Sequence, residues 1–294
     1  MQISTRTYIK ITALLALSNI SPQTFCETPS NQNAKFPRCE IPNTVGSHPL
    51  EACSLMEKLK KDREAMKDDK YILSRRKCDD YDNIIILEGE NGTGKKFLLR
   101  HILFAASCSL NTIHEADLLE HPRAANEIID DAIRHGENNH RPAVILISNI
   151  DAYSSDKNSP RYAAYMSLWR CIETHKNNAS VYFVFTTTGN HNAMPPQLQS
   201  KLYAHTIQVN NPDEQSRKEL LNHFSKRYTQ KEINTYCPDE CLQTIVRATK
   251  DFNIRNLADL CKNAEKSASL KNEQIAQPHL MEQIEKIKKF NATH

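Results

Sequence analysis

Glycine is scarce in this chain, with only 6 among its 294 residues. Three of them, Gly89, Gly92 and Gly94, fall in one short segment. Glycine reaches backbone conformations that are closed to other residues, so this concentration predicts a segment of special backbone shape. The segment is therefore the first candidate for a functional site.

Excess charge and long apolar runs are also lacking. The formal net charge is only +3, which gives no electrostatic reason to expect nucleic acid as a main partner. No apolar run approaches the roughly 20 residues needed to span a bilayer, so no transmembrane segment is predicted. The histidines are scattered without ligand spacing, and no metal site is predicted.

Acidic residues are absent from residues 1–26. In this segment Arg6 and Lys10 precede a short apolar run at 11–17, and the small residue Cys26 follows. The pattern is typical of a secretory signal peptide cut near Cys26, and it predicts a periplasmic or secreted protein. A disordered or transit-type leader is the alternative, and it predicts a cytoplasmic or organellar protein.

The chain has 9 cysteines, an odd number with scattered spacing. Cys237 and Cys241 form the only close pair, and no second pair or nearby histidine completes a zinc site. Disulfides are possible in an exported protein, but the spacing does not identify them. Cys108, Cys171 and Cys261 lie on apolar helical faces and are expected to be buried free thiols.

Hydrophobic patterning divides the chain into four parts. Residues 27–68 read as a linker followed by a helix, after the leader at 1–26. Residues 69–210 contain buried strands that alternate with helices, which predicts a parallel α/β sheet covered on both faces. Strands are expected at 84–87, 144–147, 181–185 and 206–209, and helices at 95–108, 122–135 and 160–175. Residues 211–294 read as a small all-α domain, with helices near 213–228, 238–250, 254–271 and 278–290.

The glycine-rich segment has the spacing of a phosphate-binding loop between a strand and a helix. Its expected nucleotide-binding residues are Gly89, Glu90, Asn91, Gly92, Thr93, Gly94, Lys95 and Lys96. Backbone amides at the start of the helix favour an anion, and Lys95 is placed to reach the β- and γ-phosphates. Lys96 stands where the pattern has a Ser or Thr that would bind Mg²⁺, and an ammonium repels a metal ion.

The order of motifs resembles the AAA+ ATPases, specifically the classical AAA branch, over about residues 69–275. The segments that carry the resemblance are "EGENGTGKKFLLRHI", "RPAVILISNIDAY" at 141–153, residues 181–224, and "DFNIRNLADLCKNAEKSA" at 251–268. The resemblance implies a P-loop α/β domain followed by a helical lid domain. It also implies ATP or ADP as the ligand and a protein partner, such as an AAA+ ring formed with itself or another chain.

Several positions depart from the family pattern. Ser148 replaces the Asp that holds Mg²⁺ through water, and Asn149 replaces the Glu that polarises the attacking water. Loss of a general base typically costs about 10²–10⁴-fold in rate. Asp151 lies two residues further, beyond a strand-to-loop turn, and its side chain is expected to point elsewhere. These replacements leave Mg²⁺ binding without its usual ligands.

The remaining candidate catalytic positions are also altered. The sensor asparagine aligns with Gly189, which leaves Thr188 as the nearest polar substitute. Lys201 is the candidate in the arginine-finger region, although it lacks the planar fork of arginine. Arg255, at the start of a lid helix, is either a second-sensor arginine or a surface residue. The stretch 117–123 has neither the aromatic residue nor the glycine of a substrate-threading pore loop.

Three functions are compatible with these residues. The first is an AAA+-type ATP-binding protein with impaired hydrolysis that acts as a nucleotide-binding scaffold or ring partner. The second is an active ATPase that remodels protein complexes, using Lys95, Thr188, Lys201 and Arg255. The third is a secreted interaction protein that inherited the fold without nucleotide binding. Intact phosphate-gripping residues beside altered metal and hydrolysis positions favour the first.

Overall fold

The computed structural model describes residues 49–67, 83–120, 124–153, 158–175, 178, 180–190, 194, 196–199 and 206–293. The expected leader at 1–26, most of the linker after it, and Lys201 lie outside these residues. The described residues belong to two compact units. The α/β unit comprises Val45–Pro212 with Asn253–Arg255, and the helical unit contains Asp213–Phe252 and Asn256–His294.

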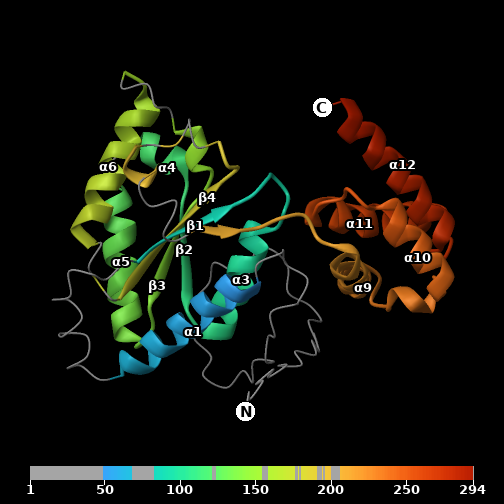
Figure 1. Ribbon diagram of the computed structural model, residues 1–294, viewed down its shortest axis with the longest axis horizontal. Coiled ribbons are helices and arrows are strands. Elements are labelled where there is room, and N and C mark those ends of the chain that lie inside the picture. The colour runs from blue at the N-terminus through green and yellow to red at the C-terminus, as the bar shows by residue number, and fades with distance from the viewer. Residues whose placement is uncertain are drawn as a thin grey trace, which may run out of the picture. The chain divides into compact units, whose positions relative to one another are not determined.

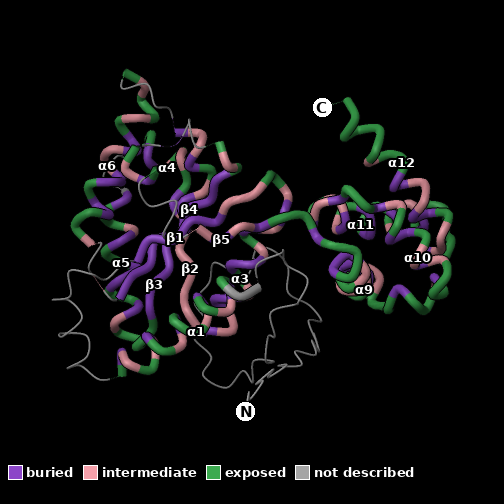
Figure 2. The backbone as a smooth tube through the Cα atoms, in the orientation of Figure 1, coloured by how far each residue is buried: buried purple, intermediate pink, exposed green. Residues whose placement is uncertain are grey.

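A five-stranded, fully parallel sheet forms the centre of the α/β unit (Figure 1). Its strands are β1 (Ile84–Glu88), β2 (Ser109–Ile113), β3 (Ala143–Ile147), β4 (Val181–Thr187) and β5 (Thr206–Gln208), in the order β2-β3-β4-β1-β5. Every residue of β3 and β4 is buried, as Figure 2 shows, because helices cover both faces. The sheet and the helical region that follows confirm the predicted fold class.

Strand β2 was not predicted from the sequence. Among the described residues it pairs only with β3, so it is an edge strand there, and all its residues except Ile113 are half-buried. An edge position accepts polar residues such as Asn111 and Thr112, which hide the apolar signal of a strand. The preceding helix also ends earlier than expected, because Ser107 adopts a left-handed conformation with φ 54°.

Helices α5 (Ala124–Asn138) and α6 (Pro160–His175) pack on one face of the sheet, against residues such as Phe183 and Phe185. Tyr182 points to the opposite face, because successive strand residues alternate. On that face its hydroxyl donates to the buried carboxylate of Asp62 in α1 (Pro49–Ala65). Arg63 links α1 to α3 (Lys95–Ala106) by donating to the carbonyl of Ala106 at 3.3 Å. The sheet is therefore held rigidly from both faces. Helix α4 (Glu115–Glu120) follows β2.

The helical unit contains α9 (Glu214–Thr229), α10 (Asp239–Ala248), α12 (Gln277–Thr293) and most of α11 (Ile254–Leu270). Helix α9 begins with a side-chain cap, because the Asp213 carboxylate accepts from the amide of Ser216 at 2.8 Å. The core of the helical unit is apolar. It includes Leu220, Phe224, Leu242, Ile245, Leu257, Leu260, Leu280 and Ile284. No helix in the described ranges is both long enough and apolar enough to cross a membrane.

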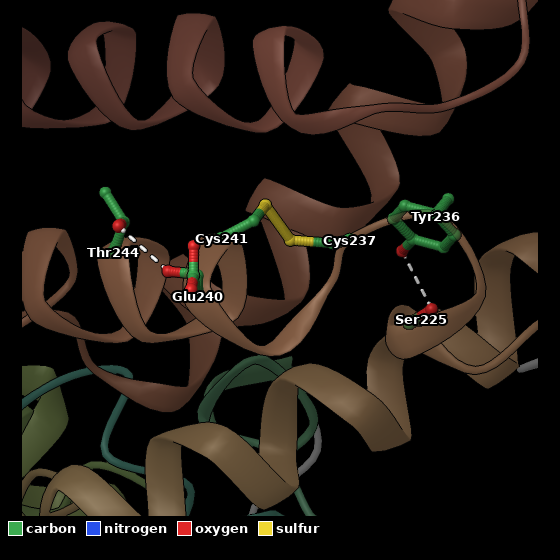
Figure 3. Close-up of a disulfide and its surroundings, with 6 residues drawn as sticks. All are labelled: Ser225, Tyr236, Cys237, Glu240, Cys241 and Thr244. Atoms are coloured by element: carbon green, nitrogen blue, oxygen red, sulfur yellow. Dashed lines mark hydrogen bonds between the residues drawn. A yellow bond between two sulfur atoms is a disulfide. The ribbon is translucent and has the colours of Figure 1, made fainter.

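A disulfide joins Cys237 to Cys241 at the start of α10 (Figure 3). Pro238 occupies the N-cap of this helix and makes no side-chain cap, so the bridge ties the first turn to the preceding chain. Just before it, the Tyr236 hydroxyl lies 2.8 Å from the Ser225 hydroxyl of α9. The disulfide and this hydrogen bond fasten the connection between the two helices.

The other cysteines follow the predictions in part. Cys171 and Cys261 are buried free thiols, as expected. Burial raises the pKa of the Cys261 thiol to about 12, which keeps it protonated and unreactive. Cys108 is free but only half-buried, and it follows the end of α3. Its placement on a buried helical face was therefore wrong.

Breaking the disulfide should lower the stability of the helical unit. For a closed loop this short, the chain-entropy model gives about 2 kcal/mol. We expect Cys241→Ser to reduce the free energy of unfolding by about that amount in denaturant titrations without reductant. Cys53→Ser, at a free half-buried cysteine, is the control. Identical midpoints for wild type and Cys241→Ser without reductant would contradict the prediction.

Candidate phosphate-binding site

The glycine-rich loop lies at the carboxyl edge of the sheet, between the end of β1 and the start of α3. The strands on both sides of β1, which are β4 and β5, fix the start of the loop. The amide of Gly89 donates to the carbonyl of Thr187 in β4 at 3.2 Å, and the amide of Val209 donates to the carbonyl of Glu88 at 2.7 Å. The loop therefore leaves the sheet from a fixed point.

Two glycines in the loop cannot be replaced without strain. Gly92 and Gly94 have φ of 89° and 95°, a region that side-chain-bearing residues rarely adopt. A Cβ on Gly92 would lie 2.5 Å from the Asn253 amide nitrogen, and one on Gly94 would lie 2.6 Å from the Ile254 Cδ1. Backbone conformation and close packing both explain the glycines noted in the sequence.

Backbone amides are available at the end of the loop. Among the described residues, no protein acceptor bonds the amides of Gly92, Gly94, Lys95 and Lys96. The first amides of a helix have no partner within it, and the helix dipole adds positive potential there. This part of the loop therefore fits an anion such as a phosphate.

Lys95 lies folded onto the loop. Its ammonium donates to the carbonyl of Gly89 and, at 2.8 Å, to that of Glu90. Burial lowers the pKa of Lys95, while the negative charges of Asp151 and Glu90 oppose that shift. The pKa of Lys96 is also lowered, by partial loss of hydration and by the charge of Arg100. Lys95 is thus a buried cation bonded to the loop.

Asp151 points toward the end of β4. Its carboxylate accepts three hydrogen bonds from the end of β4: from the Thr187 hydroxyl at 2.5 Å, and from the Thr188 amide and hydroxyl at 2.5 and 2.6 Å. Asn149 causes this placement, because its left-handed conformation (φ 54°) turns the chain into a short 3₁₀ helix, η2 (Ile150–Ala152). The turn directs residue 151 back toward β4.

The two positions before η2 carry no charge. The hydroxyl of Ser148 is buried and has no partner among the described residues, and Asn149 is exposed. The amide of Asn149 donates to the Thr186 hydroxyl at 2.9 Å, so its backbone is held in place. In the described ranges, no group of three or more His, Cys, Asp or Glu residues could hold a metal ion.

Glu88 is a residue of the site that sequence reasoning missed. A Cβ built on Gly189 would lie 3.3 Å from the Glu88 Oε1, so the carboxylate occupies space beside the sensor position. Glu88 ends a strand that is otherwise apolar, and this pattern in the sequence could have identified it as a site residue. Thr188, the expected substitute at the sensor, has its hydroxyl committed to Asp151.

Residues 253–255 belong to the α/β unit and contact the loop. The Asn253 side-chain amide donates to the carbonyl of Asn91, and the amide of Arg255 donates to that of Gly92, both at 3.1 Å. The Arg255 side chain is exposed. Arg255 therefore supports the loop through its backbone.

Comparison with known proteins finds a family match in the part of the chain that contains the loop. A family model described as the ATPase family associated with various cellular activities (AAA) matches residues 85–211. The match runs from β1 to just beyond β5 and includes the loop, Asp151 and the end of β4. Among curated proteins, none matches the chain significantly.

Proposed function

The chain contains an AAA+ ATPase module over residues 85–211, and we propose that this module binds ATP or ADP in the loop 89–96 while hydrolysing ATP poorly. The protein then acts as a nucleotide-binding scaffold or as a partner in an AAA+ ring, with itself or with another chain. Its partners are proteins, since the net charge of +3 offers little attraction to nucleic acid. Sedimentation of the ADP-loaded chain tests for the ring.

One contrast carries the proposal: the groups that suit a phosphate are present, and those that suit Mg²⁺ and water activation are replaced. The free amides of the loop and the Lys95 ammonium are the phosphate-binding groups. Mg²⁺ does not fit the donors, because Ser148 and Asn149 are neutral and Lys96 is a cation. Mg²⁺ prefers carboxylate and hydroxyl oxygens.

The position that would polarise the attacking water in this family carries an amide, Asn149. Asn149 cannot take a proton usefully, so general-base assistance is missing at its position. Asp151 is a carboxylate, but its oxygens already accept three hydrogen bonds from Thr187 and Thr188, which hold it against the end of β4. Turnover should therefore be slow even when nucleotide is bound.

We expect isothermal titration of the full chain to show ADP and ATP binding in EDTA as well as in Mg²⁺. Lys95→Ala should weaken binding at least about tenfold, because a charge-assisted contact to phosphate is lost. Lys262→Ala, at an exposed lysine of α11, is the matched control. Absence of binding in both conditions would favour the interaction protein without nucleotide. Binding that requires Mg²⁺ and is followed by phosphate release would favour the active remodelling ATPase.

Restoring the replaced groups should restore hydrolysis. The triple variant Lys96→Thr, Ser148→Asp and Asn149→Glu reintroduces a hydroxyl and two carboxylates at the altered positions. We expect it to release phosphate from ATP at least about tenfold faster than wild type, within the range attributed to a general base. Adding Lys95→Ala to the triple variant provides the inactive control. A wild-type rate equal to that of the triple variant would refute impaired hydrolysis.

We also propose that the protein is exported. The acid-free, signal-like residues 1–26 and the Cys237–Cys241 disulfide support this, because disulfides persist in oxidising compartments. Mass spectrometry of the native protein should find an N-terminus near residue 27 and an oxidised Cys237–Cys241 pair. A native chain that begins at Met1 with both thiols reduced would contradict export.

A further inference from the structure

We propose that Asp151 is a specificity determinant of the loop, whose fixed negative charge selects nucleoside diphosphates over triphosphates without the help of a divalent cation. The inference rests on the proposed function, because it requires nucleotide binding at residues 89–96. It concerns ligand choice, which is separate from the rate of hydrolysis.

The carboxylate is held in one place. All three of its donors come from Thr187 and Thr188 at the end of β4, at 2.5–2.6 Å. The Thr187 hydroxyl is itself fixed, because it accepts from the Gly189 amide at 3.0 Å. Three donors on two adjacent residues leave the Asp151 carboxylate little freedom to turn away.

Thr187 connects this charge to the loop. Its hydroxyl donates to Asp151, and its carbonyl accepts from the amide of Gly89, the first loop residue. The carbonyl of Gly89 in turn accepts from the Lys95 ammonium. Asp151 and the loop are therefore both bonded to Thr187, and the charge of Asp151 opposes the lowering of the Lys95 pKa that burial causes.

Carboxylates outnumber cations around this edge. In residues 88–96 and 148–151, all of which the structure describes, the carboxylates are Glu88, Glu90 and Asp151 and the cations are Lys95 and Lys96. The family resemblance places two acidic residues at positions 148 and 149, beside the metal ion. Here those positions are Ser148 and Asn149, and neither side chain is acidic. The charge of Asp151 is thus left to act directly on the phosphate chain.

The consequence differs between the two nucleotides. A triphosphate carries more negative charge than a diphosphate and extends one phosphate further. At a spacing of several ångströms in a partly hydrated site, repulsion between two unit charges is worth about a tenfold change in affinity. Asp151 should therefore weaken ATP binding more than ADP binding, and Mg²⁺ should not remove the difference.

The test is a titration of the full chain with ADP and ATP, in EDTA and in Mg²⁺. We expect wild type to bind ADP about tenfold more tightly than ATP in both conditions. Asp151→Asn should narrow this ratio by about tenfold, chiefly by strengthening ATP binding. Asp131→Asn, at an exposed aspartate paired with Arg134 on α5, removes the same charge elsewhere and should leave the ratio unchanged. Titration with pyrophosphate and tripolyphosphate compares two and three phosphates in the absence of the nucleoside.

The outcomes separate the inference from the proposed function. Wild type that binds ATP as tightly as ADP in EDTA overturns the inference while leaving the proposed function intact. Equal shifts for both nucleotides in Asp151→Asn overturn it as well, since they indicate a structural role for Asp151. Thermal unfolding without ligand reports whether this variant folds, and if it does not, the wild-type ratio decides. Failure of both nucleotides to bind overturns the proposed function and the inference together.

Discussion

The junction between β1 and β4 determines the geometry of the site. Parallel pairing aligns Glu88 with Thr187, and the amide of Gly89 then donates to the carbonyl of Thr187. This contact fixes the point where the chain leaves the sheet, so the loop and the end of β4 share one edge. Because β3 pairs with β4 on its other side, the residues after β3 reach the same edge. Glu88 and the glycine loop therefore lie at the same edge as Asp151, which is distant from them in sequence.

The electrostatics of this edge follow from which acids remain. Neutral residues stand at 148 and 149, while donors from Thr187 and Thr188 hold the Asp151 carboxylate in place. Lys95 bonds to loop carbonyls, and the charge of Asp151 opposes the lowering of the Lys95 pKa by burial. The proposed separation of nucleotide binding from turnover therefore depends on a small number of side chains.

The helical unit is stabilised by different means. Its helices bury an apolar core, and Asp213 caps α9 by accepting from Ser216. Helix α10 has Pro238 at its N-cap and no side-chain cap, and the Cys237–Cys241 bridge anchors its first turn instead. The stability of this unit therefore depends on whether the Cys237–Cys241 pair is oxidised. Cys261 in the same unit and Cys171 in the α/β unit are free thiols that are buried away from solvent oxidants.

The sequence by itself determined the elements with strong local patterns: the buried runs of β1, β3 and β4, helix α6, and the loop with Lys95. These signals are readable because burial on both faces and glycine spacing are local properties. Only the tertiary structure revealed strand β2, the hydrogen bonds of Asp151 to the end of β4, the position of Glu88 and the pairing of Cys237 with Cys241. A polar edge strand has weak periodicity, and a left-handed turn at Asn149 redirects Asp151 toward a strand that follows it by thirty or so residues. Such outcomes depend on partners brought together by the sheet, which no local pattern records.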